Sequence, residues 1–265
     1  MTTDVTPHTS ATPSPAPAAV RAAAVLDALA TSATGRLTLS ELARELAIPK
    51  SLTSNILVAL EGARLVERSE AGYSLGRKVV ELGGAYLSRM DEVQEFYRFC
   101  EQAPTLSRET VRIALLDQTD VIYLARYEGH PAVRLTSNIG DRMPVSLCAV
   151  GKALIARRHD HDLDQLFPDT AELPTMTRHS LKTGSDLRRD IEVIRQRGYA
   201  FEDEESTLGI ICLAVAVPTR GAHGPSLGVS VTSLKATFTR ETEAAMVAEL
   251  RQLAAAIGGQ MLPST

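Results

Sequence analysis

The sequence predicts an α+β protein in two parts, a small helical part followed by a larger part of mixed strands and helices. Three observations support this prediction. Residues 38–60 carry two short blocks of apolar residues at helical spacing. Beyond residue 104, β-prone runs and helical segments are interleaved without strict strand–helix alternation. The chain has 265 residues, 44% of them hydrophobic and 23% charged, which suits a globular protein of one large domain or two ordinary ones.

The composition excludes several classes of protein. No apolar run approaches the ~18–20 residues that a membrane-spanning helix needs. The three cysteines, Cys100, Cys148 and Cys212, are too few and too scattered for a disulfide framework or a CxxC zinc site. The first residues lack the pattern of a signal peptide, so a cytoplasmic location is expected.

The distribution of charge favours the N-terminal third as the part of the chain that binds an anionic polymer. The net charge of −4 excludes a basic surface over the whole chain, so any nucleic-acid site must be local. Residues 20–88 carry eight basic and seven acidic side chains, whereas residues 89–265 carry twenty basic and twenty-four acidic ones.

The N-terminal segment is expected to begin with a disordered tail and continue with helices. Residues 1–19 contain four prolines, five threonines and no aromatic residue, which cannot bury enough surface to offset the entropy of ordering. Residues 20–30 are rich in alanine and aliphatic residues and predict a first helix. Thr38 and Glu41 then fit a capping box. The helix that follows has an apolar face made of Leu39, Leu42, Ala43 and Leu46.

A second short helix is predicted from Pro49, which suits the first helical position. The inward face repeats the same apolar spacing through Thr53, Ile56, Leu57 and Leu60. The outward face then contains Ser51, Leu52, Ser54, Asn55 and Ala59. Two short amphipathic helices joined by about four residues form a helix-turn-helix pattern.

Two β-prone runs complete the N-terminal domain. Residues 65–68 and 73–75 flank a loop that contains Gly72, which predicts a hairpin. A helix-turn-helix followed by a hairpin is a winged helix, here over residues 20–76.

The polar outward face favours a helix that enters the major groove of DNA, with the hairpin on the backbone. Asn55 can form two hydrogen bonds with an adenine edge, and Ser51 and Ser54 can reach bases or phosphates. The complete set of expected DNA contacts is Lys50, Ser51, Leu52, Ser54, Asn55, Arg64 and Arg68. A helical protein-interaction module is the alternative, because short helix pairs are common.

A long helix is predicted over residues 77–103, ahead of the second domain. It carries an apolar stripe of Val79, Val80, Leu82, Gly83, Tyr86, Leu87, Met90 and Val93, which Phe96, Tyr97 and Phe99 extend. Such a stripe indicates a linker helix that packs on a partner. Together with the first helix, it is the expected surface of a homodimer that assembles further to a tetramer.

The second domain is expected over residues 104–262. Its predicted strands cover 110–116, 121–127, 133–136, 210–217 and 227–232. Its predicted helices cover 149–158, 185–197 and 239–258, and Gly198 ends the second of these.

The sequence resembles the IclR family of bacterial transcriptional regulators. Three stretches carry the resemblance, namely residues 38–67 with Tyr-Ser-Leu-Gly after the hairpin, residues 140–156 and residues 194–218. The resemblance implies a winged helix, a linker helix and a GAF-like α/β effector-binding domain. It further implies a dimer or a dimer of dimers that binds operator DNA, is not an enzyme, needs no cofactor and controls the catabolism of small organic acids.

The chain departs from the family in its expected recognition helix. Ser54 and Asn55 stand where the family usually has His-Arg, which removes a cation that would read guanine or phosphate. The operator sequence therefore does not follow from the resemblance. Cys148 also stands where the family often has an oxygen-bearing residue.

The resemblance implies a site for a small carboxylate effector in the second domain. A helix start near Ala149 offers unpaired backbone N–H groups, and Ser230 and Thr232 face one side of a strand. The expected effector contacts are Ala149, Val150, Glu202, Ile210, Cys212, Ser230 and Thr232. Glu204 and Glu205 are expected to be helix caps or surface groups instead.

Two alternatives from other classes remain open. One is a thiol enzyme or thiol sensor that uses Cys148 or Cys212 with a histidine. The other is a metal sensor that uses the run from His159 to Asp162, although adjacent ligands on a short segment rarely converge on one ion.

Overall fold

The computed structural model describes the chain except for residues 1–15, 130–137, 220–223 and 260–265. The chain divides into two compact units, Met1–Arg89 and Met90–Thr265, and each is described by itself. In the described part of the chain, no helix is both long and apolar enough to cross a lipid bilayer.

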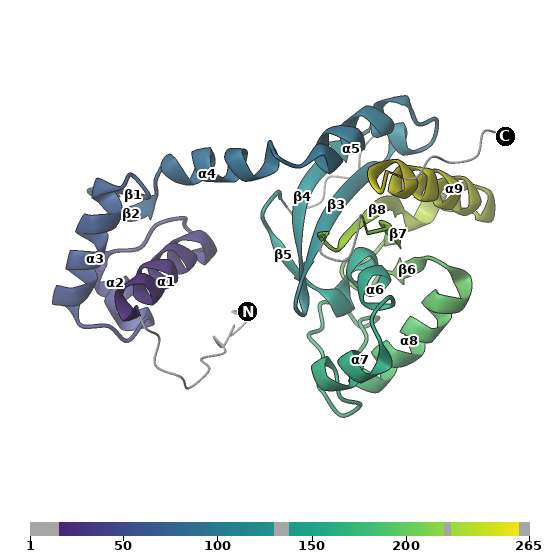
Figure 1. The fold of residues 1–265 in the computed structure, drawn as a ribbon. Coiled ribbons are helices and arrows are strands. Elements are labelled where there is room, and N and C mark those ends of the chain that lie inside the picture. Colours follow the sequence, from purple (N-terminus) through teal and green to yellow (C-terminus); the bar gives the residue numbers. More distant parts are fainter. Residues whose placement is uncertain (1–15, 130–137, 220–223, 260–265) are drawn as a thin grey trace. The chain divides into compact units, whose positions relative to one another are not determined.

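The first unit contains the predicted helix pair and hairpin (Figure 1). Its elements are α1 Pro17–Thr31, α2 Leu39–Glu45, α3 Lys50–Gly62, β1 Val66–Ser69, β2 Gly72–Leu75 and α4 Lys78–Leu87. Residues 17–19 were expected in a disordered tail, but they are helical, because α1 begins at Pro17. The rest of that expected tail, residues 1–15, lies outside the described residues. Proline lacks the N–H that a first helical residue would leave unpaired, so it starts a helix well.

The capping box that the sequence predicts at the start of α2 is present. The backbone N–H of Glu41 donates to the Thr38 hydroxyl, and the Thr38 N–H donates to the Glu41 carboxylate at 2.8 Å. Ala47 then takes a left-handed conformation, φ 52°, which lets the chain turn between α2 and α3. Pro49 is the N-cap of α3 rather than its first helical residue.

One hydrophobic core holds the first unit together. The residues of α3 predicted to face inward are buried, and they pack with residues of α1, α2 and β1. The core is formed by Val25, Ala28, Leu29, Leu42, Ile56, Leu57, Leu60 and Val66. This packing fixes which face of α3 is turned outward.

The hairpin packs on this core, and the backbone of Gly76 after it passes close to the backbone of Arg64 before it. Strands β1 and β2 pair antiparallel, with Val66 opposite Leu75. Arg64 takes a left-handed conformation, φ 61°, just before β1. A Cβ at Gly76 would lie 2.3 Å from the Arg64 carbonyl oxygen, so only glycine fits there.

The single linker helix expected over residues 77–103 is wrong. Two helices occupy this stretch, α4 and α5 Asp91–Gln102, and Met90 between them is extended at φ −100° and ψ 96°. Met90 is buried in the second unit, whereas α4 buries no residue of its own. Asp91 and Glu92 also favour a new helix start, because acidic side chains stabilise the N-terminal end of a helix.

Among its described residues, the second unit is built on a six-stranded antiparallel sheet of order β5-β4-β3-β8-β7-β6. Its strands are β3 Thr110–Asp117, β4 Asp120–Glu128, β5 Arg142–Pro144, β6 Ala200–Asp203, β7 Ile210–Ala216 and β8 Leu227–Leu234. Short helical turns lie at Leu106–Arg108, Val145–Leu147 and Lys235–Thr237. The predicted strand over 133–136 lies outside the described residues, and the sequence did not predict β5 or β6.

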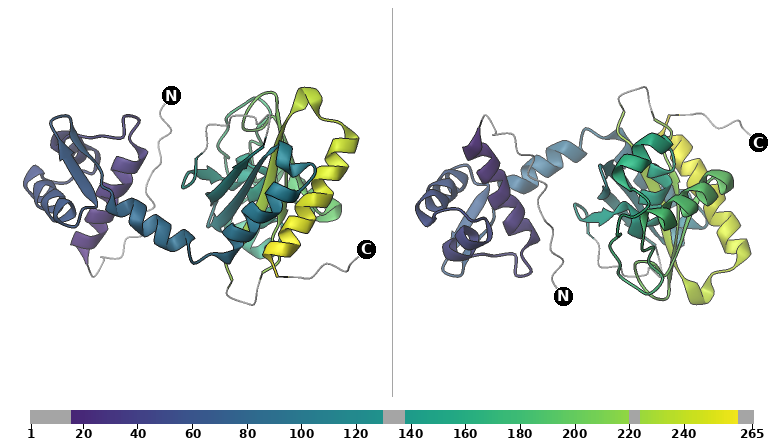
Figure 2. Two further views of the ribbon diagram at one scale, coloured as in Figure 1. Left: turned by 90° about the horizontal axis from the view of Figure 1, so that it is seen from above. Right: turned by 90° about the horizontal axis from the view of Figure 1, so that it is seen from below.

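Helices cover both faces of this sheet. They are α5, α6 Ala149–Ile155, α7 Asp160–Leu166, α8 Gly184–Arg197 and α9 Arg240–Ile257. Figure 2 shows α5 and α9 side by side on one face, and α6 lies against the other face with α8 behind it. A Cβ at Gly228 of β8 would lie 2.7 Å from a methyl carbon of Val150, so this glycine lets α6 approach the sheet.

The boundaries of the predicted helices in this unit agree with the structure, except at α6. Gly198 ends α8 in the left-handed conformation that the sequence predicts, φ 78°. The last helix is capped by Thr239, and its observed end, Ile257, is one residue from the predicted one. Helix α6 ends at Ile155, three residues earlier than expected, and α7 was not predicted.

Candidate functional sites

The first candidate site is the outward face of α3. Lys50, Ser51 and Asn55 are exposed, and Leu52 and Ser54 are half-buried. Within residues 16–129, no hydrogen bond or ion pair engages the side chains of Lys50, Ser51 and Asn55. These side chains are therefore free to bind a partner. Arg64 and Arg68 are exposed too, and the Arg68 guanidinium lies 5.9 Å from the centre of the Tyr73 ring.

The second candidate site is the face of the sheet that α6 covers. The strand register places Arg112 of β3 opposite Ser230 of β8. It also places Thr232 opposite Cys212 of β7, and Cys212 opposite Glu202 of β6. Cross-strand partners point to the same side of a sheet, and Ser230 and Thr232 are two residues apart on β8. These residues therefore share one face, in two adjacent lines, Arg112–Ser230 and Thr232–Cys212–Glu202. We call Arg112, Ser230, Thr232, Cys212 and Glu202 the polar row.

The middle of the polar row is made of short side chains. The Cys212 thiol and the Thr232 hydroxyl lie 3.3 Å apart. Ser230 and Thr232 are both buried, so their hydroxyl groups are shielded from solvent. Burial, with the nearby Glu202 carboxylate, raises the pKa of Cys212 well above its ordinary value. Ile210 points to the same face at the start of β7, opposite Leu234.

Glu202 forms one end of the polar row and is completely buried. Its Oε1 atom accepts hydrogen bonds from the backbone N–H of Ser206 at 3.0 Å and from the Ser206 hydroxyl at 3.4 Å. Its Oε2 atom has no hydrogen-bond partner among the described residues. The thiol of Cys212, the cross-strand neighbour of Glu202, also interacts with this carboxylate.

Arg112 forms the other end, and sequence reasoning missed it. The residue is only 5% exposed, and its Nε and Nη2 atoms have no hydrogen-bond partner in the part of the chain that the structure describes. Its guanidinium lies 5.2 Å from the centre of the Tyr123 ring on β4. The signal in the sequence was one charged residue inside the apolar run 110–116.

Helix α6 brings Cys148, Ala149 and Val150 over this face. All three are buried, and Cys148 is the N-cap of α6. The Cys148 thiol lies 3.6 Å from the Pro144 carbonyl oxygen, and burial raises its pKa to about 12. Such a thiol stays protonated, which disfavours nucleophilic chemistry. Val150 packs against Gly228, so its side chain belongs to the contact between helix and sheet.

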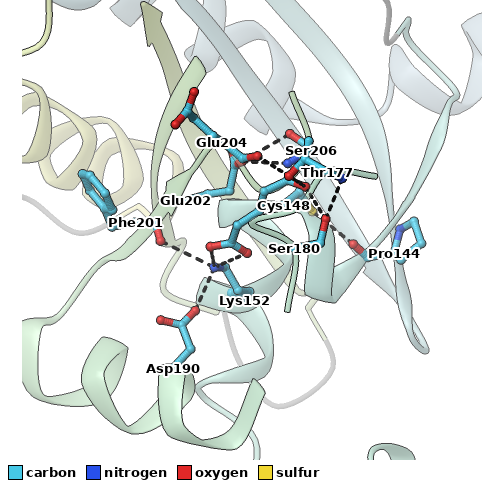
Figure 3. Close-up of polar contacts among 11 residues, drawn as sticks. Pro144, Cys148, Lys152, Thr177, Ser180, Asp190, Phe201, Glu202, Glu204 and Ser206 are labelled. Carbon is cyan, nitrogen blue, oxygen red and sulfur yellow. Dashed lines mark hydrogen bonds and ion pairs between the residues drawn. The ribbon is translucent and has the colours of Figure 1, made fainter. Parts of the chain in front are cut away.

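Lys152 of α6, which sequence reasoning also missed, holds the helix in place (Figure 3). Its side chain is fully buried, and its Nζ atom lies 2.7 Å from Glu205 Oε1 and 2.8 Å from Asp190 Oδ2. Burial alone would lower the pKa of Lys152, but the two carboxylates raise it above its ordinary value. The network ties α6 to α8 and to the segment after β6.

The expectation that Glu205 is a helix cap or a surface group is wrong. Glu205 is buried, and it is the closest partner of Lys152. Its backbone carbonyl also accepts a hydrogen bond from the Ser180 hydroxyl at 2.6 Å. Burial raises the pKa of Glu205 to about 7, although Lys152 acts in the opposite direction. Glu204, in contrast, binds Lys235 at the surface.

The run from His159 to Asp162 lies at the start of α7. Asp160 pairs with Arg195 at 2.7 Å, and His161 contacts Gln165. No group of three or more histidine, cysteine or acidic residues is placed to hold a metal ion within residues 16–129, 138–219 and 224–259. The described geometry thus offers no converging ligands at this run.

Two stretches of the chain match domains of one known protein family. Residues 18–70 match the IclR helix-turn-helix domain, and residues 84–258 match the bacterial transcriptional regulator IclR C-terminal domain. The chain belongs to the IclR family. It is therefore an IclR-type transcriptional regulator with a helix-turn-helix domain and a C-terminal effector domain.

Relatives of this regulator support the assignment. The transcriptional regulator KdgR of Dickeya chrysanthemi is 27% identical over 226 residues, which cover 84% of this chain and 73% of the relative. An IclR regulator from Alicyclobacillus acidocaldarius has the same fold, with a TM-score of 0.80 at 24% identity over 92% of this chain and 98% of that one. An IclR homologue from Microbacterium hydrocarbonoxydans, solved with 4-hydroxybenzoate, gives a TM-score of 0.73 at 21% identity over 91% and 98%.

Proposed function

We propose that this regulator binds operator DNA through α3 and the hairpin, and that a small organic acid bound at the polar row modulates that binding. The observation that carries the effector half of this proposal is the polar row, which lies buried inside the second unit. A row of hydroxyl, thiol and charged groups is buried against an apolar helix, and the charged groups at its two ends lack complete hydrogen bonding among the described residues. A buried group of hydroxyl, thiol and charged side chains on one face favours a site that binds a small polar ligand.

The DNA half of the proposal rests on the outward face of α3. Asn55→Ala should weaken binding to a duplex selected from a random library by about 1–3 kcal/mol and leave binding to random DNA unchanged. Lys50→Ala should weaken binding to both duplexes. It should also reduce by about one the slope of the logarithm of the binding constant against the logarithm of the salt concentration. Fluorescence anisotropy at several salt concentrations measures both, with Lys182→Ala in the second unit as the matched control. Equal losses on both duplexes for Asn55→Ala would refute a base-reading role.

The effector half of the proposal concerns Ser230 and Thr232, together with Cys212, Glu202 and the end of α6. The 4-hydroxybenzoate complex of the Microbacterium homologue supports a carboxylate as the class of ligand. Ser230→Ala combined with Thr232→Val should lower the affinity for the ligand at least tenfold. The reason is that loss of one hydrogen bond of about 1.4 kcal/mol raises the dissociation constant tenfold. DNA binding without the ligand should remain. Calorimetry on the full chain with a panel of small carboxylates tests this.

Coupling between the two sites has its own test. If the ligand prefers one DNA-binding state, linkage requires that the operator duplex change ligand affinity by the same factor as the ligand changes DNA affinity. Calorimetry with and without the duplex measures this factor. Identical ligand affinities in both experiments would show a site that is occupied but not coupled.

The regulator is further proposed to act as a homodimer that can assemble to a tetramer, and to control a catabolic operon. Val80, Leu82 and Tyr86 of α4 are 77%, 53% and 52% exposed, and α4 buries no residue within its own unit. An apolar helix face of this kind needs a partner. Light scattering at micromolar concentration should give at least twice the mass of one chain, and a monomer with intact operator binding would refute the dimer.

A further inference from the structure

A cavity of about 420 Å³ lies where the C-terminal end of α6 meets α8, α9 and the end of β7. It is separate from the polar row, because no residue of that row lines it. The side chains at this place are too short to fill the space between the four elements. The small residues that line the cavity are Ala153, Ala156, Gly198, Ala216, Ala254 and Ala255. Its volume is in the range of small-molecule sites, which is roughly 300–1,000 Å³.

The short strand β6 leaves the sheet open beside the cavity. The pairing of β6 with β7 ends where Ala200 lies opposite Ala214. Val215 and Ala216 lie beyond this last pair, and in the described part of the chain they pair with β8 alone. Both residues line the cavity. The floor is therefore made of backbone and of short apolar side chains, and alanine has no rotamers that could close the space.

The rim of the cavity is positively charged. Arg157, Arg195 and Arg251 line it, whereas no acidic side chain among the described residues does so. The charge of Arg195 is balanced, because its guanidinium lies 2.7 Å from the Asp160 carboxylate. Arg157 and Arg251 are exposed, and within residues 138–219 and 224–259 their side chains bond only to backbone carbonyl groups. Two unbalanced guanidinium charges thus stand beside an apolar floor.

Backbone carbonyl groups hold these two guanidinium groups in place. Arg157 donates from Nη1 to the Val217 carbonyl oxygen at 3.1 Å, and Arg251 donates from Nη2 to the Arg197 carbonyl oxygen at 3.4 Å. A side chain that is already anchored loses less freedom when a ligand binds. Each guanidinium carries five N–H groups, so donors remain for a ligand after these bonds are made. Anchored cations at an apolar cavity differ in this respect from ordinary solvated arginines.

We infer that this cavity binds a phosphate monoester of a small apolar group, with the phosphate on Arg157 and Arg251 and the apolar group on the alanine floor. The inference goes beyond the proposed function, because it gives the regulator a second ligand site. A phosphate monoester carries about −1.5 to −2 charges at pH 7, which matches two unbalanced guanidinium groups. Its oxygens also suit the planar fork of a guanidinium. A monocarboxylate would balance only one of the two charges, and inorganic phosphate would leave the floor uncovered.

Isothermal titration calorimetry on the full chain tests the inference, with phenyl phosphate and inorganic phosphate as probes. Phenyl phosphate should bind at least tenfold more tightly than inorganic phosphate. Arg157→Gln and Arg251→Gln should each lower the affinity for phenyl phosphate at least tenfold. Arg240→Gln is the matched control, because Arg240 is an exposed arginine on the same helix as Arg251 but does not line the cavity. It should leave this affinity within twofold.

A further variant tests the role of the floor. Ala216 is half-buried at the cavity, so the larger side chain of Ala216→Leu should occupy part of the space and lower the affinity for phenyl phosphate at least tenfold. If Ala216→Leu does not fold, the two exposed arginines still decide the question.

Three results would overturn the inference. They are no binding of phenyl phosphate, binding no tighter than that of inorganic phosphate, and an equal loss of affinity in Arg240→Gln. The proposed function would stand after any of them, because the polar row is tested with carboxylates and with other variants.

Discussion

Replacing Lys152 by methionine should strongly destabilise the second unit. The Lys152 side chain is fully buried, and its ammonium lies 2.7 Å and 2.9 Å from the two oxygens of Glu205 and 2.8 Å from Asp190. Methionine fills a similar volume but leaves two carboxylates without a cation. Removing one partner of a buried ion pair typically costs about 3–5 kcal/mol. For a unit of this size, that corresponds to a drop of roughly 6–20 °C in melting temperature.

The pH dependence of this cost tests the reasoning more sharply. Glu205 has a pKa of about 7 in the folded chain, above the ordinary 4.5, so the folded state binds its proton more tightly than the unfolded state. Proton binding by Glu205 therefore stabilises the folded chain. This contribution to the free energy of unfolding is complete below pH 4.5 and is lost as the pH rises through 7. In Lys152→Met no ammonium opposes this rise of the Glu205 pKa, so the variant should lose much more stability at pH 8 than at pH 5.

Differential scanning calorimetry of the full chain at pH 5 and pH 8 measures both effects. Lys182→Met is the matched control, because Lys182 is exposed and should leave the melting temperature within about 2 °C. A Lys152→Met transition that matches the original protein at pH 8 would refute the argument. So would an equal loss at both pH values, because the cost would then come from packing rather than charge.

Two further predictions concern the winged helix. Gly76→Ala should lower the stability of the first unit by about 1–3 kcal/mol in urea denaturation, because its Cβ would lie 2.3 Å from the Arg64 carbonyl. Gly83 in α4 has open space where a Cβ would lie, so Gly83→Ala should be neutral or stabilising by up to about 1 kcal/mol. Equal losses of stability in the two glycine variants would contradict the clash at Gly76.

Thr38→Ala should lower stability by about 0.5–2 kcal/mol, because it removes the capping box of α2. Ser40→Ala should change thermal stability little, and similar losses in these two variants would exclude capping as the cause.

The sequence by itself determined those parts of the protein that depend on local rules. Apolar spacing placed Ile56, Leu57 and Leu60 inside the first unit, and the order of Thr38 and Glu41 fixed the start of α2. Alternation along one strand placed Ser230 and Thr232 on the same side, as the register confirms. These features depend on residues within a few positions of one another, so a single sequence carries the information.

Only the tertiary structure decided which distant residues meet. Residues 77–103 have the sequence of one helix, but the backbone of Met90 is extended and divides them into α4 and α5. Lys152 pairs with Glu205 only because α6 packs over the end of β6. Arg112 and Glu202 share one face because the sheet is ordered β3-β8-β7-β6, so strands far apart in sequence become neighbours. Sheet register is set by pairing between such strands, and a pattern along one strand does not name its neighbour.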